Sequence, residues 1–316
     1  MPYDLLDLDM APVQAALRSE GLLEDLVNDI AKRVWKACSL WLEGDLDCDW
    51  AMVEWFFETP KARGILDLVT CREGRIKVID WKTTSNVKEP SFQNRIKYSA
   101  QSKLYLTEGV RALEEWFYEG AHHYPNPKSV PPVNPDGFIK AYLEYRCLDI
   151  GDPEKQGNLV VPVLRTPELE RGAAQLLEYV ERVYGQMSQE SGPWLQNMPG
   201  ACLRYWERDP QCSYWHDCTG EAGQHPPLLT EADLLRASEV VPKSKSAIEA
   251  FWHCPERFRR DKVLQGNSDD GNVKTRMGTC LHAAIAEIYT QVFFKAGKLL
   301  ELPSAAVHPI DTEELV

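Results

Sequence analysis

The sequence lacks any uninterrupted apolar stretch of about 18 residues or more, the length that a membrane-spanning helix requires. Its first ten residues, MPYDLLDLDM, are acidic and do not show the basic and then apolar pattern of a secretory signal peptide. Internal repeats are missing, and so is any close pair of cysteines of the CxxC type. These absences argue against a membrane protein or a secreted one, and we expect a cytoplasmic protein.

The chain nevertheless contains nine cysteines. Thiols stay reduced in the cytoplasm, so we expect these residues to be metal ligands or core residues rather than disulfides. Cys202, Cys212 and Cys218 lie in a stretch without periodicity that is rich in Trp, Tyr and Pro, where a bound metal would stabilise the fold. Three thiolates need a fourth partner, and Cys254 is the candidate.

Positive charge is scarce, with 35 basic against 48 acidic residues and a net charge of −13 among 316 residues. Such a balance argues against a protein that coats nucleic acid. The charge is uneven, however. Residues 1–60 hold 13 acidic and 4 basic residues, whereas residues 243–262 hold 3 acidic and 6 basic ones. A local basic groove is therefore compatible with the composition.

The periodicity of apolar residues predicts the order of the secondary structure. Helical spacing predicts helices in the ranges 11–42, 97–118, 167–187, 230–238, 244–253 and 277–294. Runs rich in β-branched and aromatic residues predict strands at 51–57, 64–71, 75–84 and 138–149. A short turn that contains Gly74 makes the second and third strands a hairpin, whereas 122–137 and 193–227 are expected to be loops. This order predicts an α/β (α+β) fold with a mixed central sheet flanked by helices.

Two aspartates and a lysine on the hairpin are expected to converge. Residues i and i+2 of a strand share a face, so Asp80 and Lys82 point the same way, and Asp67 can meet them from the paired strand. Converging carboxylates repel each other unless a divalent cation lies between them. A lysine beside them can orient a metal-bound water or help to deprotonate it. This combination suits metal-assisted phosphodiester hydrolysis, and the alternative is a surface hairpin with scattered charges.

The segments Gly64-Ile-Leu-Asp67 and Asp80-Trp-Lys82 resemble motifs II and III of the PD-(D/E)xK nuclease superfamily, in its RecB-like branch. That branch adds a QxxxY motif on the following helix. Gln101 and Tyr105 match this motif, and their spacing places both on one helix face. The resemblance implies a restriction-endonuclease-like core.

The same resemblance implies roles for these residues. Asp67 and Asp80 would bind Mg²⁺ or Mn²⁺, with the main-chain carbonyl of Trp81 as a further ligand. Lys82 would position or activate the attacking water. Gln101 and Tyr105 would align the nucleic-acid strand. Glu54, on the preceding strand, matches an acidic position often seen in the branch, and a surface glutamate at a strand end is the alternative.

The first motif of the branch is found near the end of the chain. Residues 244–258 resemble its SxSxxxxFxxCPxxF segment, and Gly278 with His282 resembles its GxxxH helix, whose histidine is a metal ligand. The order 230–316 followed by 1–220 would be the usual one. We therefore expect one circularly permuted nuclease domain, with its core in 1–229 and its permuted N-terminal part in 230–316. The alternative is that 230–316 begin a second, truncated copy.

The resemblance also implies an iron–sulfur cluster. Nuclease domains of the AddB type and the CRISPR-associated ones bind a [4Fe–4S] cluster through one cysteine beside the first helix and three after the last core helix. Cys254 would be the first of these ligands, and Cys202, Cys212 and Cys218 would be the three others. Tetrahedral zinc and a metal-free site are the alternatives. The remaining cysteines are expected to pack in the core, at positions 38, 48, 71, 147 and 280.

The resemblance thus implies an exodeoxyribonuclease that acts on duplex ends or single strands of DNA, in recombination, repair or phage DNA processing. A helicase or recombination protein could be its partner. The alternative is a catalytically idle iron–sulfur module that binds nucleic acid beside such a partner. Two basic runs border the expected site and are candidates for phosphate contacts, with solvated surface charge as the alternative. They comprise Lys88, Arg95, Lys97 and Lys103, and Arg257, Arg259, Arg260 and Lys262.

Overall fold

A computed structural model of the chain describes residues 9–19, 23–83, 90–97, 99–120, 140–148, 159–189, 230–239, 242–264 and 273–300. Its centre is one mixed sheet with the strand order β1-β2-β3-β4-β5. Strands β1 to β3 pair antiparallel, β4 runs parallel to β3, and β5 is antiparallel to β4. The strands are β1 (Trp50–Glu58), β2 (Arg63–Arg72), β3 (Arg75–Thr83), β4 (Lys140–Leu148) and β5 (Leu159–Leu164).

The predicted hairpin is confirmed as the pair β2 and β3. Arg72 pairs with Arg75, which leaves a connection of two residues, Glu73 and Gly74. Both have positive φ, 49° and 73°, as a two-residue type I′ turn requires. Because this turn fixes the register, it also fixes which side chains of β2 and β3 share a face.

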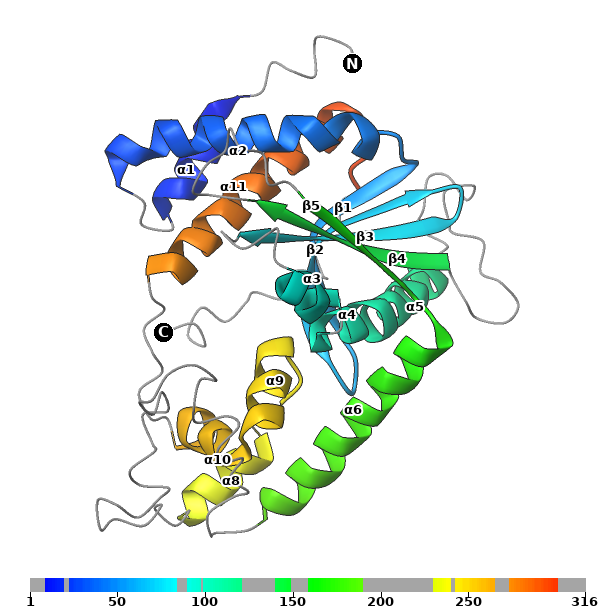
Figure 1. The fold of residues 1–316 in the computed structure, drawn as a ribbon, viewed down its shortest axis with the longest axis vertical. Helices are drawn as coiled ribbons and strands as arrows, with labels where there is room; N and C mark the ends of the chain where they lie inside the picture. The colour runs from blue at the N-terminus through cyan, green and yellow to red at the C-terminus, as the bar shows by residue number, and fades with distance from the viewer. Residues whose placement is uncertain are drawn as a thin grey trace.

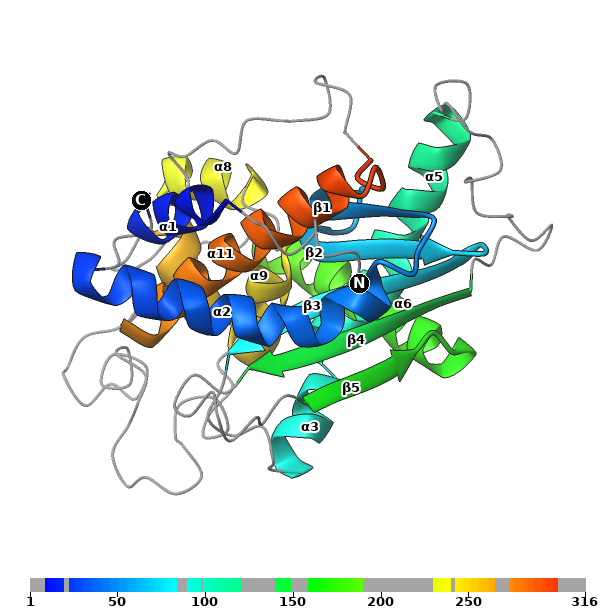
Figure 2. The same cartoon turned by 90° about the horizontal axis from the view of Figure 1, so that it is seen from above.

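Three helices cover the upper face of the sheet in Figure 1, namely α1 (Met10–Ser19), α2 (Glu24–Asp45) and α11 (Val273–Lys295). Seen from above, α2 and α11 lie side by side across the strands (Figure 2). This upper layer has its own core, into which β3 contributes Ile79 and Trp81. After α11 the chain reaches β1, where the Ala51 amide donates to the Lys298 carbonyl at 2.8 Å.

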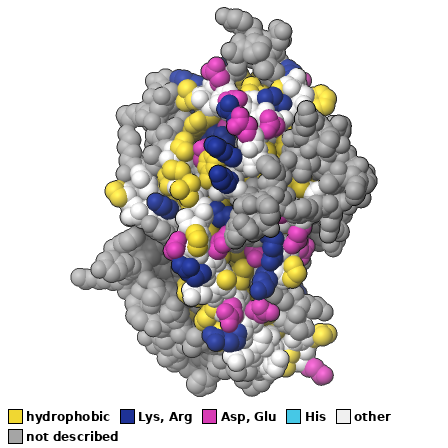
Figure 3. Space-filling view, turned by 90° about the vertical axis from the view of Figure 1, so that its right-hand side faces the viewer, with side chains coloured by type: hydrophobic (Ala, Val, Ile, Leu, Met, Phe, Trp, Pro, Cys, Tyr) yellow, Lys and Arg dark blue, Asp and Glu magenta, His cyan; other side chains and the backbone are white. Residues whose placement is uncertain are grey.

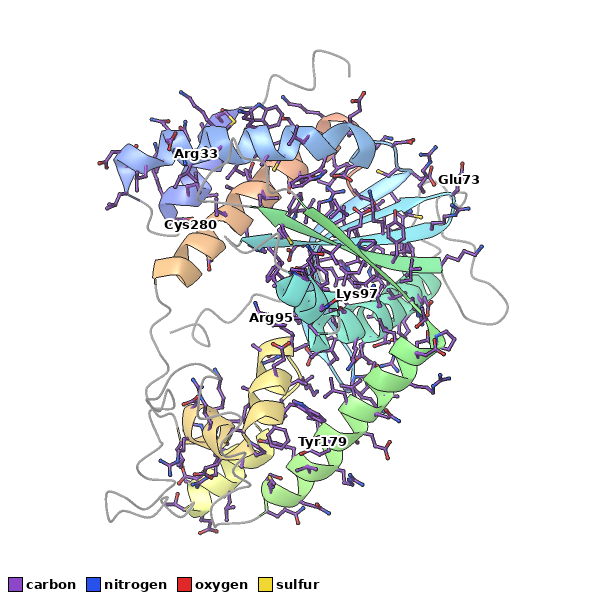
Figure 4. The ribbon with its side chains drawn as sticks, in the orientation of Figure 1. Arg33, Glu73, Arg95, Lys97, Tyr179 and Cys280 are labelled. Atoms are coloured by element: carbon purple, nitrogen blue, oxygen red, sulfur yellow. The ribbon has the colours of Figure 1, made fainter. Side chains whose placement is uncertain are left out.

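The lower layer covers the opposite face. Beneath the sheet lie α3 (Pro90–Lys97), α4 (Ala100–Leu104), the π-helical turn η2 (Tyr105–Gly109), α5 (Val110–Gly120) and α6 (Pro167–Met187). Four short elements follow below, namely α8 (Glu231–Glu239), α9 (Lys245–His253), α10 (Pro255–Phe258) and the π-helical turn η5 (Arg259–Val263). Of these, α9 packs against both α4 and α6, and α10 packs against α9. Figure 4 shows Tyr179 of α6 pointing toward α9, where its ring lies 4.7 Å from that of Trp252.

The predicted α/β class and the mixed sheet with flanking helices are confirmed, in a form consistent with a restriction-endonuclease-like core. The helix predicted at 97–118 begins at Ala100, because α3 ends at Lys97 and Ser99 caps a new helix by accepting the Ser102 amide, and it continues through α4, η2 and α5 to Gly120. Strand β5 was not predicted. It contains Pro162, which weakens a strand pattern but is tolerated on a sheet edge. The expected loops at 122–137 and 193–227 lie outside the described residues.

Two further expectations can be compared with the structure. All five cysteines expected in the core are buried, as predicted for Cys38, Cys48, Cys71, Cys147 and Cys280. The expectation for Arg259 and Arg260 was wrong, because both are buried and pair with the buried carboxylate of Glu256 instead of facing phosphates. None of the helices in the described part of the chain has the length and apolar character needed to cross a membrane.

Candidate active site

The regular alternation of β1 and β2 breaks at one pair of residues, Glu54 and Asp67. In a regular strand, residues three positions apart face opposite sides of the sheet. Met52 and Trp55 nevertheless both face the lower core, and so do Leu66 and Val69. The alternation of side chains in each strand is therefore shifted by one residue at this point. Glu54 has a φ of 50°, which is unfavourable for a residue with a side chain. Backbone strain of this kind persists where surrounding structure enforces it, often at functional sites.

Asp67 occupies the point where β2 and β3 diverge. The ladder between these strands reaches Leu68 and Ile79 and is not continued by Asp67 and Asp80. In place of a ladder bond, the Trp81 amide donates to Asp67 Oδ2 at 2.8 Å. The carboxylate of Asp67 therefore satisfies a backbone group that the divergence exposes, and this contact fixes its position beside β3.

Asp80 lies on the lower side of β3, where it meets three side chains predicted for the site. It is 1 % exposed, and its carboxylate pairs with the ammonium group of Lys82. The Gln101 amide of α4 donates to Asp80 Oδ1. Tyr105, one helical turn after Gln101, is also buried and lies close to Asp80. The QxxxY pair thus lies at the site, and its glutamine binds Asp80 directly.

Gly64, the glycine before Asp67, lets the aromatic side chains behind the site approach the strand. A Cβ atom at position 64 would lie 2.9 Å from Phe57 and 3.5 Å from Tyr105. Phe57 is buried and contacts Tyr105 edge to face, with 6.2 Å between ring centroids. In the GxxD motif, Asp67 thus supplies a carboxylate, and Gly64 leaves room for Phe57 and for Tyr105 of the QxxxY pair.

The structure brings His282 of α11 to the same place from the upper layer. Its Nδ1 lies 3.4 Å from Asp67 Oδ2, and its ring shares a hydrogen bond with the backbone of Trp81. Burial lowers the pKa of the imidazole, which keeps it neutral and able to act as a ligand. The side chain remains 32 % exposed, so a cation can reach it from solvent.

Negative charge accumulates at this point. Burial and the charges of Asp80 and Glu54 raise the pKa of Asp67 well above its usual value. Burial and Asp80 raise the pKa of Glu54 to about 7, although part of this side chain is exposed to solvent. Among the described residues, these three carboxylates share the site with one ammonium group, that of Lys82. A divalent cation would relieve this repulsion.

The donor types at the site fit such a cation. Carboxylate oxygens suit Mg²⁺ and Mn²⁺, and a neutral imidazole suits Mn²⁺ as well. In their present arrangement, no three His, Cys, Asp or Glu side chains among the described residues form a complete metal-binding group. Asp80 instead faces Lys82 and Gln101, whereas Asp67 faces His282. The fit therefore rests on the chemistry of the donors and on their shared location.

Two supporting residues were not found from the sequence. Tyr145 of β4 shares a hydrogen bond of 2.8 Å with Ser102, which anchors the start of α4 to the sheet next to Gln101. Its ring lies 5.6 Å from Lys82 Nζ, a cation–π contact. Ser99, as a polar residue before a helix, carried a recognisable capping signal. Tyr145 carried none, because its contacts join residues more than forty positions apart.

Of the four cysteines expected to bind a cluster, the structure describes only Cys254. It is buried, carries a free thiol and caps the N-terminus of α10, directly before Pro255. Cys202, Cys212 and Cys218 lie outside the described residues. The expected ligand set therefore stays a prediction.

Comparison with known proteins adds one finding. Residues 8–219 match the PD-(D/E)XK nuclease superfamily, a range that runs from α1 through the sheet and α6 and ends before α8. His282 lies beyond it. No curated protein and no solved structure matches the chain significantly. The match covers well over half of the sequence and contains Asp67, Asp80, Lys82 and Gln101, so the chain belongs to the PD-(D/E)XK nuclease superfamily.

Proposed function

We propose that the chain is a metal-dependent exonuclease that hydrolyses phosphodiester bonds of DNA at duplex ends or in single strands. One observation carries the proposal. Asp67, Asp80, Lys82 and His282, which come from three elements and opposite ends of the sequence, lie together where β2 and β3 diverge. A purely structural ion pair between Lys82 and Asp80 would not explain why an imidazole and a third carboxylate, that of Glu54, lie at the same place.

The residues have distinct roles in this proposal. Asp67, Asp80 and His282 would hold Mg²⁺ or Mn²⁺, with the Trp81 carbonyl as a further ligand. When bound, such a cation polarises the phosphodiester and lowers the pKa of water. The Lys82 ammonium group orients the attacking water and offsets charge at the phosphate. Gln101 holds Asp80 in place, and Tyr105, which is buried, supports the site from within the fold rather than by touching the DNA.

The DNA substrate is expected to approach along α3 and α4. Arg95 and Lys97 lie in the last turn of α3, and Figure 4 shows them close to α4, which carries Gln101. The opposite side of the molecule, which carries the β2–β3 turn and faces the viewer in Figure 3, presents basic and acidic side chains close together. Phosphate contacts from Arg95 and Lys97 would then hold the strand beside the site.

The RecB-like assignment, the circular permutation and the [4Fe–4S] cluster are further parts of the proposal. The contact of His282 with Asp67 supports permutation, because a separate truncated copy would have no reason to complete this site. Cys254, the cysteine of the Cys-Pro segment, lies directly before α10 and would be the first ligand of the cluster. We expect anaerobically purified protein to contain about four iron atoms and four sulfides per chain, and Cys254→Ser to lose them. Zinc in place of iron would contradict the cluster.

The function itself is tested by incubating the purified chain with end-labelled single-stranded and duplex DNA. We expect release of labelled products in Mg²⁺ or Mn²⁺ and none in the presence of a chelator. Products that shorten stepwise from one end would establish exonuclease action. Binding of DNA without metal-dependent cleavage would instead favour the catalytically idle module that serves a partner such as a helicase or recombination protein.

A further inference from the structure

A buried cage of side chains encloses Trp81, the residue between Asp80 and Lys82. Because strand side chains alternate, Asp80 and Lys82 face the lower layer and the indole of Trp81 faces the upper layer. Trp81 is 2 % exposed. The cage consists of Trp41 and Asp45 from α2, Arg146 from β4 and Tyr289 from α11.

The cage fixes the indole on several sides. The ring of Trp41 lies 5.2 Å from that of Trp81, and the ring of Tyr289 lies 5.3 Å away. The Arg146 guanidinium is 5.4 Å from the Trp81 ring and 5.3 Å from the Trp41 ring, so it stacks with both indoles. Stacked aromatic and guanidinium groups contribute energy and also hold a defined geometry.

Asp45 holds the cage together. Its Oδ1 accepts from Arg146 Nη2 at 2.6 Å and its Oδ2 from Arg146 Nη1 at 2.5 Å, a two-pronged ion pair. The Tyr289 hydroxyl donates to Asp45 Oδ2 at 2.8 Å, and Lys77 Nζ lies 3.0 Å from Oδ1. A carboxylate with these partners joins α2, β3, β4 and α11 behind the sheet. Such planar pairing orients the guanidinium as well as balancing its charge.

The backbone of Trp81 lies between the cage and the active site. Its amide donates to Asp67, and its backbone also bonds to the ring of His282. A displacement of the indole therefore moves the atoms that hold two of the proposed metal ligands. Tyr289 adds a second link, since it lies seven residues after His282 on the same helix, α11.

We infer that Trp41, Asp45, Arg146 and Tyr289 are positioning residues, which act through Trp81 to set Asp67 and His282 at the geometry that a divalent cation requires. The inference rests on the proposed function in that Asp67 and His282 bind metal. Groups that orient ligands from outside the coordination sphere commonly change metal affinity by about 10-fold or more when removed.

The test compares two substitutions that each remove one buried tyrosine hydroxyl. Tyr289→Phe loses the bond to Asp45, and the matched control Tyr184→Phe loses a bond to the Ala237 carbonyl in the lower layer. Mn²⁺ binding is measured by titration calorimetry without DNA. We expect Tyr289→Phe to raise the dissociation constant about 10-fold and Tyr184→Phe to leave it unchanged. In cleavage assays, Tyr289→Phe should lower kcat and leave KM for DNA unchanged.

A second variant, Trp41→Leu, removes the outer ring of the stack at a partly exposed position and should weaken Mn²⁺ binding in the same way. Wild-type Mn²⁺ affinity in both Tyr289→Phe and Trp41→Leu would contradict the positioning role. A wild-type protein that binds no Mn²⁺ and cleaves no DNA would instead contradict the proposed function, so the two failures are distinguishable.

Discussion

Replacing Asp80 by asparagine should abolish metal-dependent DNA cleavage. The substitution keeps the volume of the side chain and an oxygen that can accept the bond from Gln101, but it removes the charge that holds a cation. Because a bound cation contributes several kcal/mol to transition-state stabilisation, we expect the rate to fall by about a thousandfold. The measurement is the initial rate of product release from end-labelled DNA in saturating Mn²⁺.

The fold should tolerate this change. Asp80→Asn relieves the electrostatic repulsion of residue 80 with Asp67 and Glu54. The Lys82 ammonium group still has the carboxylate of Asp67 as a neighbour of opposite charge. We expect the thermal midpoint to stay within about 4 °C of the wild-type value. Asp47→Asn, at an exposed ion pair with Arg72, is the matched control and should cleave normally. An Asp80→Asn variant that retains a tenth of the wild-type rate would exclude Asp80 as a metal ligand.

Replacing Asp45 by asparagine should cause the largest loss of stability. Asp45 and Arg146 are both almost fully buried, and removing one charge leaves the other in a medium of low polarity. Loss of one partner of a buried pair costs about 3–5 kcal/mol, and Glu144 at 3.1 Å from Arg146 places the expected loss near the lower end. A fall of about 5 °C in the thermal midpoint follows for a chain of this size.

The loss should depend on pH. Burial opposes ionisation of Asp45, but hydrogen bonds and charge from Arg146 and Lys77 overcome it and lower the pKa of this carboxyl. A lowered pKa in the folded state stabilises the protein above the unfolded value, about 3.9, and this stability is lost as pH falls through the folded value.

The difference in thermal midpoint between wild type and Asp45→Asn should therefore shrink in acid. Asp29→Asn, which removes the partner of Arg33 in an exposed pair, is the control and should change stability by about 0.5 kcal/mol or less. An equal loss in the two variants, or a difference that does not depend on pH, would show that the buried pair does not stabilise the fold.

Most of the site could be predicted from the sequence because its residues fall in short motifs with fixed local geometry. Asp80 and Lys82 share a strand face by alternation, and a hairpin places Asp67 beside them. Gln101 and Tyr105 share a helix face. The role of His282 was predicted only from the resemblance of its segment to a motif, because no local pattern in the sequence indicates against which face of the sheet α11 packs.

The rest depends on contacts between distant parts of the chain. The pairing of Asp45 with Arg146 joins residues 101 positions apart, and nothing in the sequence near either one indicates it. The shifted alternation at Glu54 likewise arises from two strands together and not from either alone. Arg259 and Arg260 were misjudged for the same reason, because local sequence showed a basic run and only packing revealed the buried Glu256 beside it.

The central claim is that Asp67, Asp80 and His282 form one metal site although they lie far apart in the sequence. The most direct test is a crystal structure of the chain with Mn²⁺, in which anomalous scattering locates the ion. We expect an anomalous peak within about 2.5 Å of a carboxylate oxygen of Asp67, one of Asp80 and a ring nitrogen of His282. An ion bound elsewhere, or one that excludes His282, would contradict the account.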